Sequence, residues 1–174
     1  MESGHTFPVN APLGAAEAQG RAARLLRLAT YAAVGTALTL VLVKTGAWLL
    51  SGSIAVLSSL VDSVADVAAS AINLLAVRHA LTPADREHRF GHGKAEPLAA
   101  LGQATFIAGS AVFLALEGID RLMNPQPIAH APVAIGVMLF SLAATCGLVL
   151  LQRHVARTTR SIAVQADSMH YLSD

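Results

Sequence analysis

Four long apolar stretches constrain the fold of this chain more than any other feature of its sequence. They run over residues 25–50, 54–77, 98–116 and 133–151, and a fifth begins after Arg160. Each reaches about the 20 residues that an α-helix needs to cross a bilayer. Charged residues make up only 13% of the chain, and 174 residues cannot bury four such helices in a soluble core. We predict an all-α membrane protein, a helical transmembrane bundle with four complete spans and the start of a fifth.

The basic residues predict the orientation of these spans, because Lys and Arg are retained on the cytoplasmic side in short loops. Ten of the twelve lie before or at the very start of the first stretch, or follow the second and fourth: Arg21, Arg24, Arg27, Arg78, Arg86, Arg89, Lys94, Arg153, Arg157 and Arg160. Lys44 lies inside the first stretch, where we expect its long stem to snorkel toward the outer surface. We therefore expect a multi-pass protein of the cell (inner) membrane with a cytoplasmic N-terminus. Residues 1–24 are expected to form a disordered cytoplasmic tail, and residues 25–174 a transmembrane domain.

Two carboxylates, Asp62 and Asp66, lie four residues apart within the second apolar stretch. Each costs about 2.5–3.5 kcal/mol at bilayer depth on insertion scales, so the two need a compensating cation. Residues four apart share a helix face, as do His170 and Asp174 in the fifth stretch. From the helical rise, Asp66 lies about 20 Å and His170 about 15 Å from the inner ends of their spans. We predict that the two pairs converge on one metal ion.

Three carboxylates and one imidazole suit Zn²⁺ or Fe²⁺ better than Mg²⁺ or Ca²⁺, and they also accept Cd²⁺. The alternative role for the Asp pair is hydrogen bonding between helices. The alternative for His170 is that of a buried histidine whose ring nitrogens are hydrogen-bonded within the core. Ser59, Ser70 and Asn73 fall near the stripe of the Asp pair, which is the expected lining of a hydrated pathway. The only cysteine, Cys146, lies away from these ligands, and we interpret it as a small apolar filler.

Three segments of the sequence match the motifs of one protein family, in the same order along the chain: LVDSVADVAAS at 60–70, PADREHRFGHGKAEPLAAL at 83–101 and AVQADSMHYLSD at 163–174. With these segments the chain resembles the cation diffusion facilitators, and most closely the bacterial zinc and ferrous-iron efflux pumps among them. The resemblance implies a divalent cation efflux transporter rather than an enzyme, and a homodimer in the full-length protein. It also implies a tetrahedral transport site made by Asp62, Asp66, His170 and Asp174.

The resemblance implies a second metal site in the connection after the second stretch, on Asp85, His88 and His92. This Asp-x2-His-x3-His spacing offers one carboxylate and two imidazoles, a reasonable zinc set, although loop histidines are often merely solvated. The counterpart of Lys94 in the family helps to hold the dimer through a charge cluster.

Protons compete with metal for deprotonated carboxylates and neutral imidazole, so we expect metal/proton antiport with protons as the counter-ion. No further cofactor and no nucleic-acid partner is expected. An intramembrane aspartyl protease also uses two membrane Asp residues, but its Gly-x-Gly-Asp signature is missing, and a pair on one helix suits shared metal ligation better.

The resemblance also implies a sixth helix and a cytoplasmic ferredoxin-like domain, and this sequence stops at Asp174 before either. A helix that ended there would leave unpaired carbonyl groups in the bilayer. We expect a fragment of a longer protein. A non-transporting membrane fragment or an interaction module is the alternative function.

Overall fold

The computed structural model describes residues 13–82, 94–124 and 131–173. These ranges hold five helices and no strand: α1 (Leu13–Ser51), α2 (Ile54–Ala80), α3 (Ala95–Met123), α4 (Ala131–Thr159) and α5 (Ile162–Ser173). Four of them, α1 to α4, are long and apolar enough to cross a membrane. The predicted fold class, an all-α membrane bundle with four spans and a shorter fifth helix, is confirmed.

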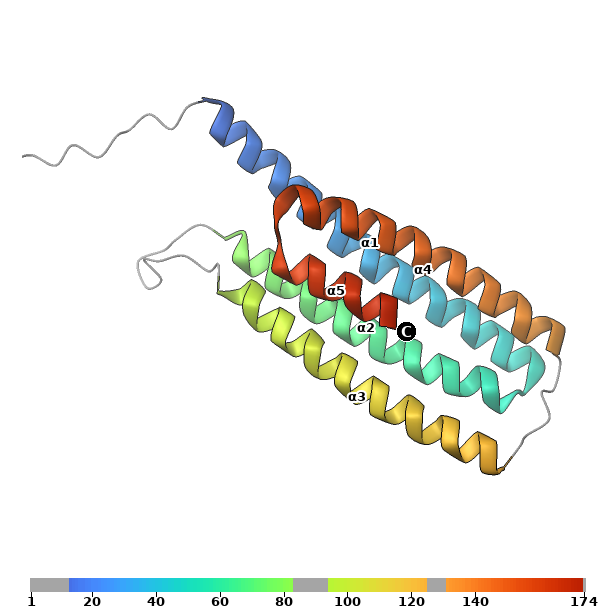
Figure 1. The fold of residues 1–174 in the computed structure, drawn as a ribbon. Coiled ribbons are helices and arrows are strands. Elements are labelled where there is room, and N and C mark those ends of the chain that lie inside the picture. Colours follow the sequence, from blue (N-terminus) through green and yellow to red (C-terminus); the bar gives the residue numbers. More distant parts are fainter. Residues whose placement is uncertain (1–12, 83–93, 125–130, 174) are drawn as a thin grey trace, which may run out of the picture.

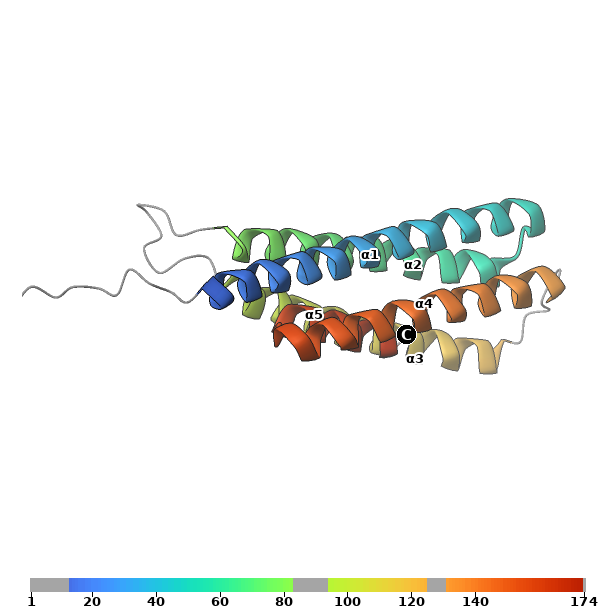
Figure 2. The same cartoon turned by 90° about the horizontal axis from the view of Figure 1, so that it is seen from above.

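The helices form two layers, as Figures 1 and 2 show. One layer contains α1 and α2, and the other contains α3, α5 and α4, with α5 between the two long helices. The helix α5 starts at the end of the bundle where α2 ends and α3 begins, and it runs to the middle of the bundle. We call this end the α2–α3 end and the opposite one the α1–α2 end. The arrangement places the last turns of α5 against the central part of α2.

The first helix is longer than the apolar pattern predicts. It begins at Leu13 rather than at residue 25, so residues 13–24 are helical where we expected a disordered tail. Ala, Glu, Gln and Arg dominate this segment, and all are strong helix formers. The side chains of residues 17–21 are exposed, so propensity rather than packing accounts for the extension. Residues 1–12 lie outside the described ranges.

Two residues with left-handed backbone reverse the chain between neighbouring helices. Gly52 has φ +61°, which glycine adopts without a steric penalty, and its N–H donates to the Trp48 carbonyl at 2.8 Å. Arg160 has φ +55°, and its N–H donates to the Ala156 carbonyl at 2.8 Å at the end of α4. The second reversal brings α5 back into the bundle.

Small side chains allow the helices to pack closely. Ala29, Ala33 and Ala37 are fully buried and recur every four residues along α1, which packs against α2 and α4. Small residues at such spacing let the backbones of membrane helices approach each other. Large apolar side chains such as Leu42 and Leu50 point outward instead and are mostly exposed, as a lipid-facing surface requires. The buried face of α2 combines the apolar residues Val56, Ala69 and Val77 with several polar ones.

Candidate metal transport site

One face of α2 carries polar side chains into the bundle. Ser63, Asp66, Ser70 and Asn73 are all buried and recur every three or four residues, so they share one helix face. Ser59 continues the stripe but is only partly buried. Polar residues of a membrane helix face the bundle interior because lipid cannot satisfy their hydrogen bonds. The predicted polar stripe is therefore present.

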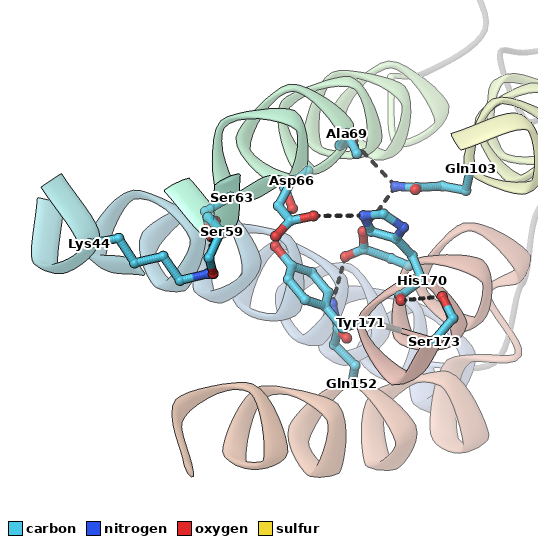
Figure 3. A network of polar contacts seen from close by, with 12 residues as sticks. Lys44, Ser59, Ser63, Asp66, Ala69, Gln103, Gln152, His170, Tyr171 and Ser173 are labelled. Carbon is cyan, nitrogen blue, oxygen red and sulfur yellow. Dashed lines mark hydrogen bonds and ion pairs between the residues drawn. The ribbon is translucent and has the colours of Figure 1, made fainter. Parts of the chain in front are cut away.

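Asp66 contacts His170 across the interface between α2 and α5 (Figure 3). The Nε2 of His170 lies 3.2 Å from Oδ1 of Asp66, and the two side chains are 1% and 9% exposed. The structure thus brings together one residue from each of the two predicted pairs. A carboxylate and an imidazole at this distance can share a proton or, after a small separation, a metal ion.

Asp62 lies one turn from Asp66 on α2 and is partly exposed. Both carboxylates border a cavity of about 580 Å³ whose walls come from α1, α2, α4 and α5. The cavity runs from the α1–α2 end, where Val56 and Ala134 line it, along α4 as far as Arg153. Asp62 also borders a second cavity of about 410 Å³ between α2 and α3. An ion at the Asp pair would therefore have open space on the α1–α2 side.

Cys146 also lines the larger cavity, and its side chain is exposed. Our interpretation of this residue as an apolar filler is wrong, because the thiol stands on a wall of the cavity instead of filling a packed interior.

Lys44 does not snorkel to the outer surface as predicted. Its side chain is buried, and its Nζ donates to the Ser63 Oγ at 2.6 Å and to the Ser59 carbonyl at 3.1 Å (Figure 3). These two acceptors on the neighbouring helix satisfy the ammonium within the bundle, so it need not reach the membrane surface. Lys44 lines the same cavity as Asp62 and Asp66, so a positive charge stands among the carboxylates.

Tyr171 links α5 to α2 by a hydrogen bond beside the Asp66–His170 pair. Its hydroxyl lies 2.7 Å from the Ser70 Oγ, and both side chains are buried. Its ring also stacks edge to face on the imidazole of His170, with centroids 5.5 Å apart. Sequence reasoning missed this residue, because nothing in its spacing distinguishes it from a core aromatic.

Sequence reasoning also missed a second buried carboxylate, Asp167 of α5. Gln103 of α3 donates from Nε2 to its Oδ1 at 2.9 Å, and Gln152 of α4 donates from Nε2 to its Oδ2 at 2.6 Å. The Gln103 Nε2 also donates to the Ala69 carbonyl of α2 at 3.3 Å (Figure 3). A signal was available, because Asp167 precedes His170 by three residues and so shares its face. The two glutamines are also unusual in or beside apolar stretches.

Four predicted ligands lie outside the described ranges: Asp174 of the transport site, and Asp85, His88 and His92 of the loop site. Within residues 13–82, 94–124 and 131–173, no three Asp, Glu, His or Cys side chains converge closely enough to hold a metal ion. The described part of the site consists of the Asp66–His170 pair, with Asp62 one turn away on the same cavity.

A bundle of apolar helices with an acidic and imidazole site in its interior is typical of a membrane transporter of cations, and comparison with known proteins identifies the class. Residues 30–174 match the cation efflux transmembrane domain, so the chain belongs to the cation efflux family. The resemblance to cation diffusion facilitators is thereby confirmed, and the family consists of transporters rather than enzymes.

Individual relatives are similar over most of this chain. It is 52% identical over 149 residues to the cation-efflux pump FieF of Shewanella oneidensis. It is 53% identical over 151 residues to that of Klebsiella pneumoniae and 54% over 153 residues to that of Pectobacterium carotovorum. These alignments cover 86–87% of this chain and 50–51% of each relative. The chain therefore spans about half the length of the curated relatives it matches.

Proposed function

We propose that this chain contains the ion-translocating helices of a divalent metal efflux transporter of the cell (inner) membrane. The observation that carries the proposal is the contact between Asp66 and His170, 3.2 Å apart and buried between α2 and α5. A carboxylate and an imidazole are ligands of Zn²⁺ and Fe²⁺. The relatives are named as cation-efflux pumps, which supports the same function.

In this proposal Asp62, Asp66, His170 and Asp174 bind the transported ion, which is Zn²⁺, Fe²⁺ or Cd²⁺. Asp174 follows His170 by four residues and so belongs to the same face of the helix. The loop residues Asp85, His88 and His92 form a second site that modulates transport. The resemblance to the family further supports a homodimer with a cytoplasmic N-terminus.

The contact between Asp66 and His170 supports an exchange of metal for protons. Without metal, Asp66 and His170 are hydrogen-bonded to each other. An arriving ion has to replace this hydrogen bond with one coordination bond to each side chain. Metal requires both groups to be deprotonated, whereas protons arriving from outside occupy the same atoms. Imidazole changes its charge between about pH 5 and 8, which makes His170 the natural proton exchanger.

Substitution of the proposed ligands tests the site. We expect Asp66→Ala and His170→Ala each to abolish metal uptake into vesicles that contain the reconstituted protein, because each removes a ligand that no neighbour replaces. Asp85→Ala should only lower the rate. Asp120→Ala is the control, since this exposed carboxylate on α3 bonds only to Asn124 one turn away. Full transport by Asp66→Ala, or equal loss from Asp85→Ala, would contradict the division of roles.

An imposed pH gradient tests the exchange. With the same vesicles, a more acidic compartment on the side that receives the metal should accelerate its flux, because protons displace the ion there. Metal-driven proton movement in the opposite direction should be recorded by a pH-sensitive dye. Metal flux that does not respond to the gradient would rule out antiport while leaving the metal site intact.

A further inference from the structure

A second buried polar cluster lies between the Asp66–His170 pair and the α2–α3 end of the bundle. It consists of Asp167, Gln103, Gln152 and Asn73, and we call it the Asp167 cluster. Its members come from all four helices α2 to α5, and none is more than 3% exposed. Asp167 precedes His170 by three residues on α5, which places it about 4.5 Å nearer the α2–α3 end. The Asp167 cluster therefore lies at a level between that end and the Asp66–His170 pair.

Several buried polar atoms of the Asp167 cluster form no hydrogen bond. The Oε1 atoms of Gln103 and Gln152 are buried without a partner, as are Nδ2 and Oδ1 of Asn73. Asn73 lies close enough to the Asp167 carboxylate to interact with it, although no hydrogen bond of good geometry forms. Leaving a buried polar group unsatisfied costs about 1–3 kcal/mol, and native structures do so rarely. Several such atoms around one carboxylate are therefore available to a ligand.

We propose that the Asp167 cluster is a transient site for the divalent cation on its way between the α2–α3 end and the Asp66–His170 pair. The assignment to the transport route rests on the proposed function. Carboxylate and amide oxygens are acceptable ligands for hydrated divalent ions. With a single carboxylate and no imidazole, the cluster binds more weakly than the transport site and can release the ion onward.

The two glutamine amides explain how the same cluster can be stable both empty and occupied. An amide carries donors on its nitrogen and an acceptor on its oxygen. In the structure both nitrogens face Asp167, which compensates the carboxylate in the absence of a cation. Rotation of the amides presents the Oε1 atoms to an incoming ion instead. For Gln103 this rotation also breaks the bond to the Ala69 carbonyl, which links α3 to α2.

Direct binding tests the site without relying on transport. The full-length protein carrying Asp66→Ala, Asp85→Ala and His88→Ala is titrated with Mn²⁺, an ion that favours oxygen ligands, and bound Mn²⁺ is followed by electron paramagnetic resonance. We expect a weak site that persists in this background and disappears when Asp167→Asn is added. Asp120→Asn is the matched control and should leave it unchanged. Binding that is absent, or that survives Asp167→Asn, overturns the proposal.

Transport by the otherwise native protein tests the place of the site on the route. We expect Asp167→Asn to lower the maximal rate of Zn²⁺ uptake about tenfold while equilibrium Zn²⁺ affinity stays within about threefold, because only passage is affected. Asp167→Glu, which keeps the charge, should recover part of the rate. A purely structural or water-filled cluster would instead lower the unfolding temperature of Asp167→Asn without a loss of Mn²⁺ binding, and this result overturns the proposal. If the native protein transports nothing but binds Mn²⁺ through Asp167, the proposed function fails and the cation site stands.

Discussion

At the scale of single residues, the hydroxyl groups of Tyr171 and Ser70 join α5 to α2 near the site. They lie 2.7 Å apart in a buried position. Tyr171→Phe keeps the ring against His170 but leaves the Ser70 hydroxyl without this partner, and Ser70→Ala removes the other half of the same bond. We expect each variant to lower the unfolding free energy in detergent by about 1 kcal/mol.

A double-mutant cycle checks this assignment by denaturant unfolding. The double variant should lose little more than either single variant, because both remove one shared hydrogen bond. Thr39→Val serves as a control, since the exposed Thr39 hydroxyl bonds only to the Gly35 carbonyl of its own helix. Strictly additive losses would show that the two hydroxyls do not act as a pair.

Some residues of the site were predictable from sequence and others were not, for a physical reason. Asp66 and His170 are recognisable in the sequence because an ionisable side chain at bilayer depth requires a partner. Helical periodicity also shows which other residues of the same helix lie on the same face. Periodicity does not reveal which atom on another helix lies opposite. For that reason the acceptors of Lys44 and the glutamine donors to Asp167 became visible only in the structure.

At the scale of the helices, Lys44 joins α1 to α2 through its two bonds to Ser59 and Ser63. Lys44→Met preserves the length of the side chain but leaves both acceptors without their donor. It also removes the positive charge nearest this part of α2. We expect a loss of about 1–3 kcal/mol in unfolding free energy, since hydrogen bonds to charged groups are stronger than neutral ones.

Thermal and denaturant unfolding of Lys44→Met, compared with Thr39→Val on the same helix, measures this contribution. A Lys44→Met protein as stable as the unsubstituted one would mean that the desolvation cost of the ammonium cancels its bonds.

Hydropathy located the helices but not their ends. The second apolar stretch predicts 54–77 and the helix runs to Ala80, while the fourth predicts 133–151 and its helix covers Ala131–Thr159. A helix continues past the apolar core of a membrane for as long as its residues favour the helical backbone. Apolar character therefore marks only the part that lipid would surround.

At the scale of the whole molecule, the positions of Lys and Arg predict which end of the bundle faces the cytoplasm. The α2–α3 end is the basic one, with Arg78, Lys94 and Arg160. In a background with Cys146→Ala, we expect Ser51→Cys to react with a membrane-impermeant maleimide added to intact cells. Thr82→Cys should react only after permeabilisation. The reverse pattern would place the N-terminus outside.

The sequence predicts four spans, but it does not predict which helices are neighbours. The position of α5 between α3 and α4 depends on contacts of small and polar side chains, including Ala163 and Val164 against Val155 and Ala99. Such contacts cannot be recognised from the periodicity of hydropathy along the sequence, because a helix face against lipid and one against another helix are equally apolar. The predicted depths of Asp66 and His170 nevertheless agree with the level at which α5 meets α2.

The position of Cys146 on the cavity wall gives the protein an internal reporter. It is the only thiol in the sequence, and it borders the same space as Asp62 and Asp66. A small fluorescent or paramagnetic group attached to this sulfur would stand beside the proposed metal site, whereas a bulky one would fill the space itself. We expect mercurials and oxidants that enter the cavity to modify this thiol, so assays of metal flux should use a reducing buffer that does not chelate the metal.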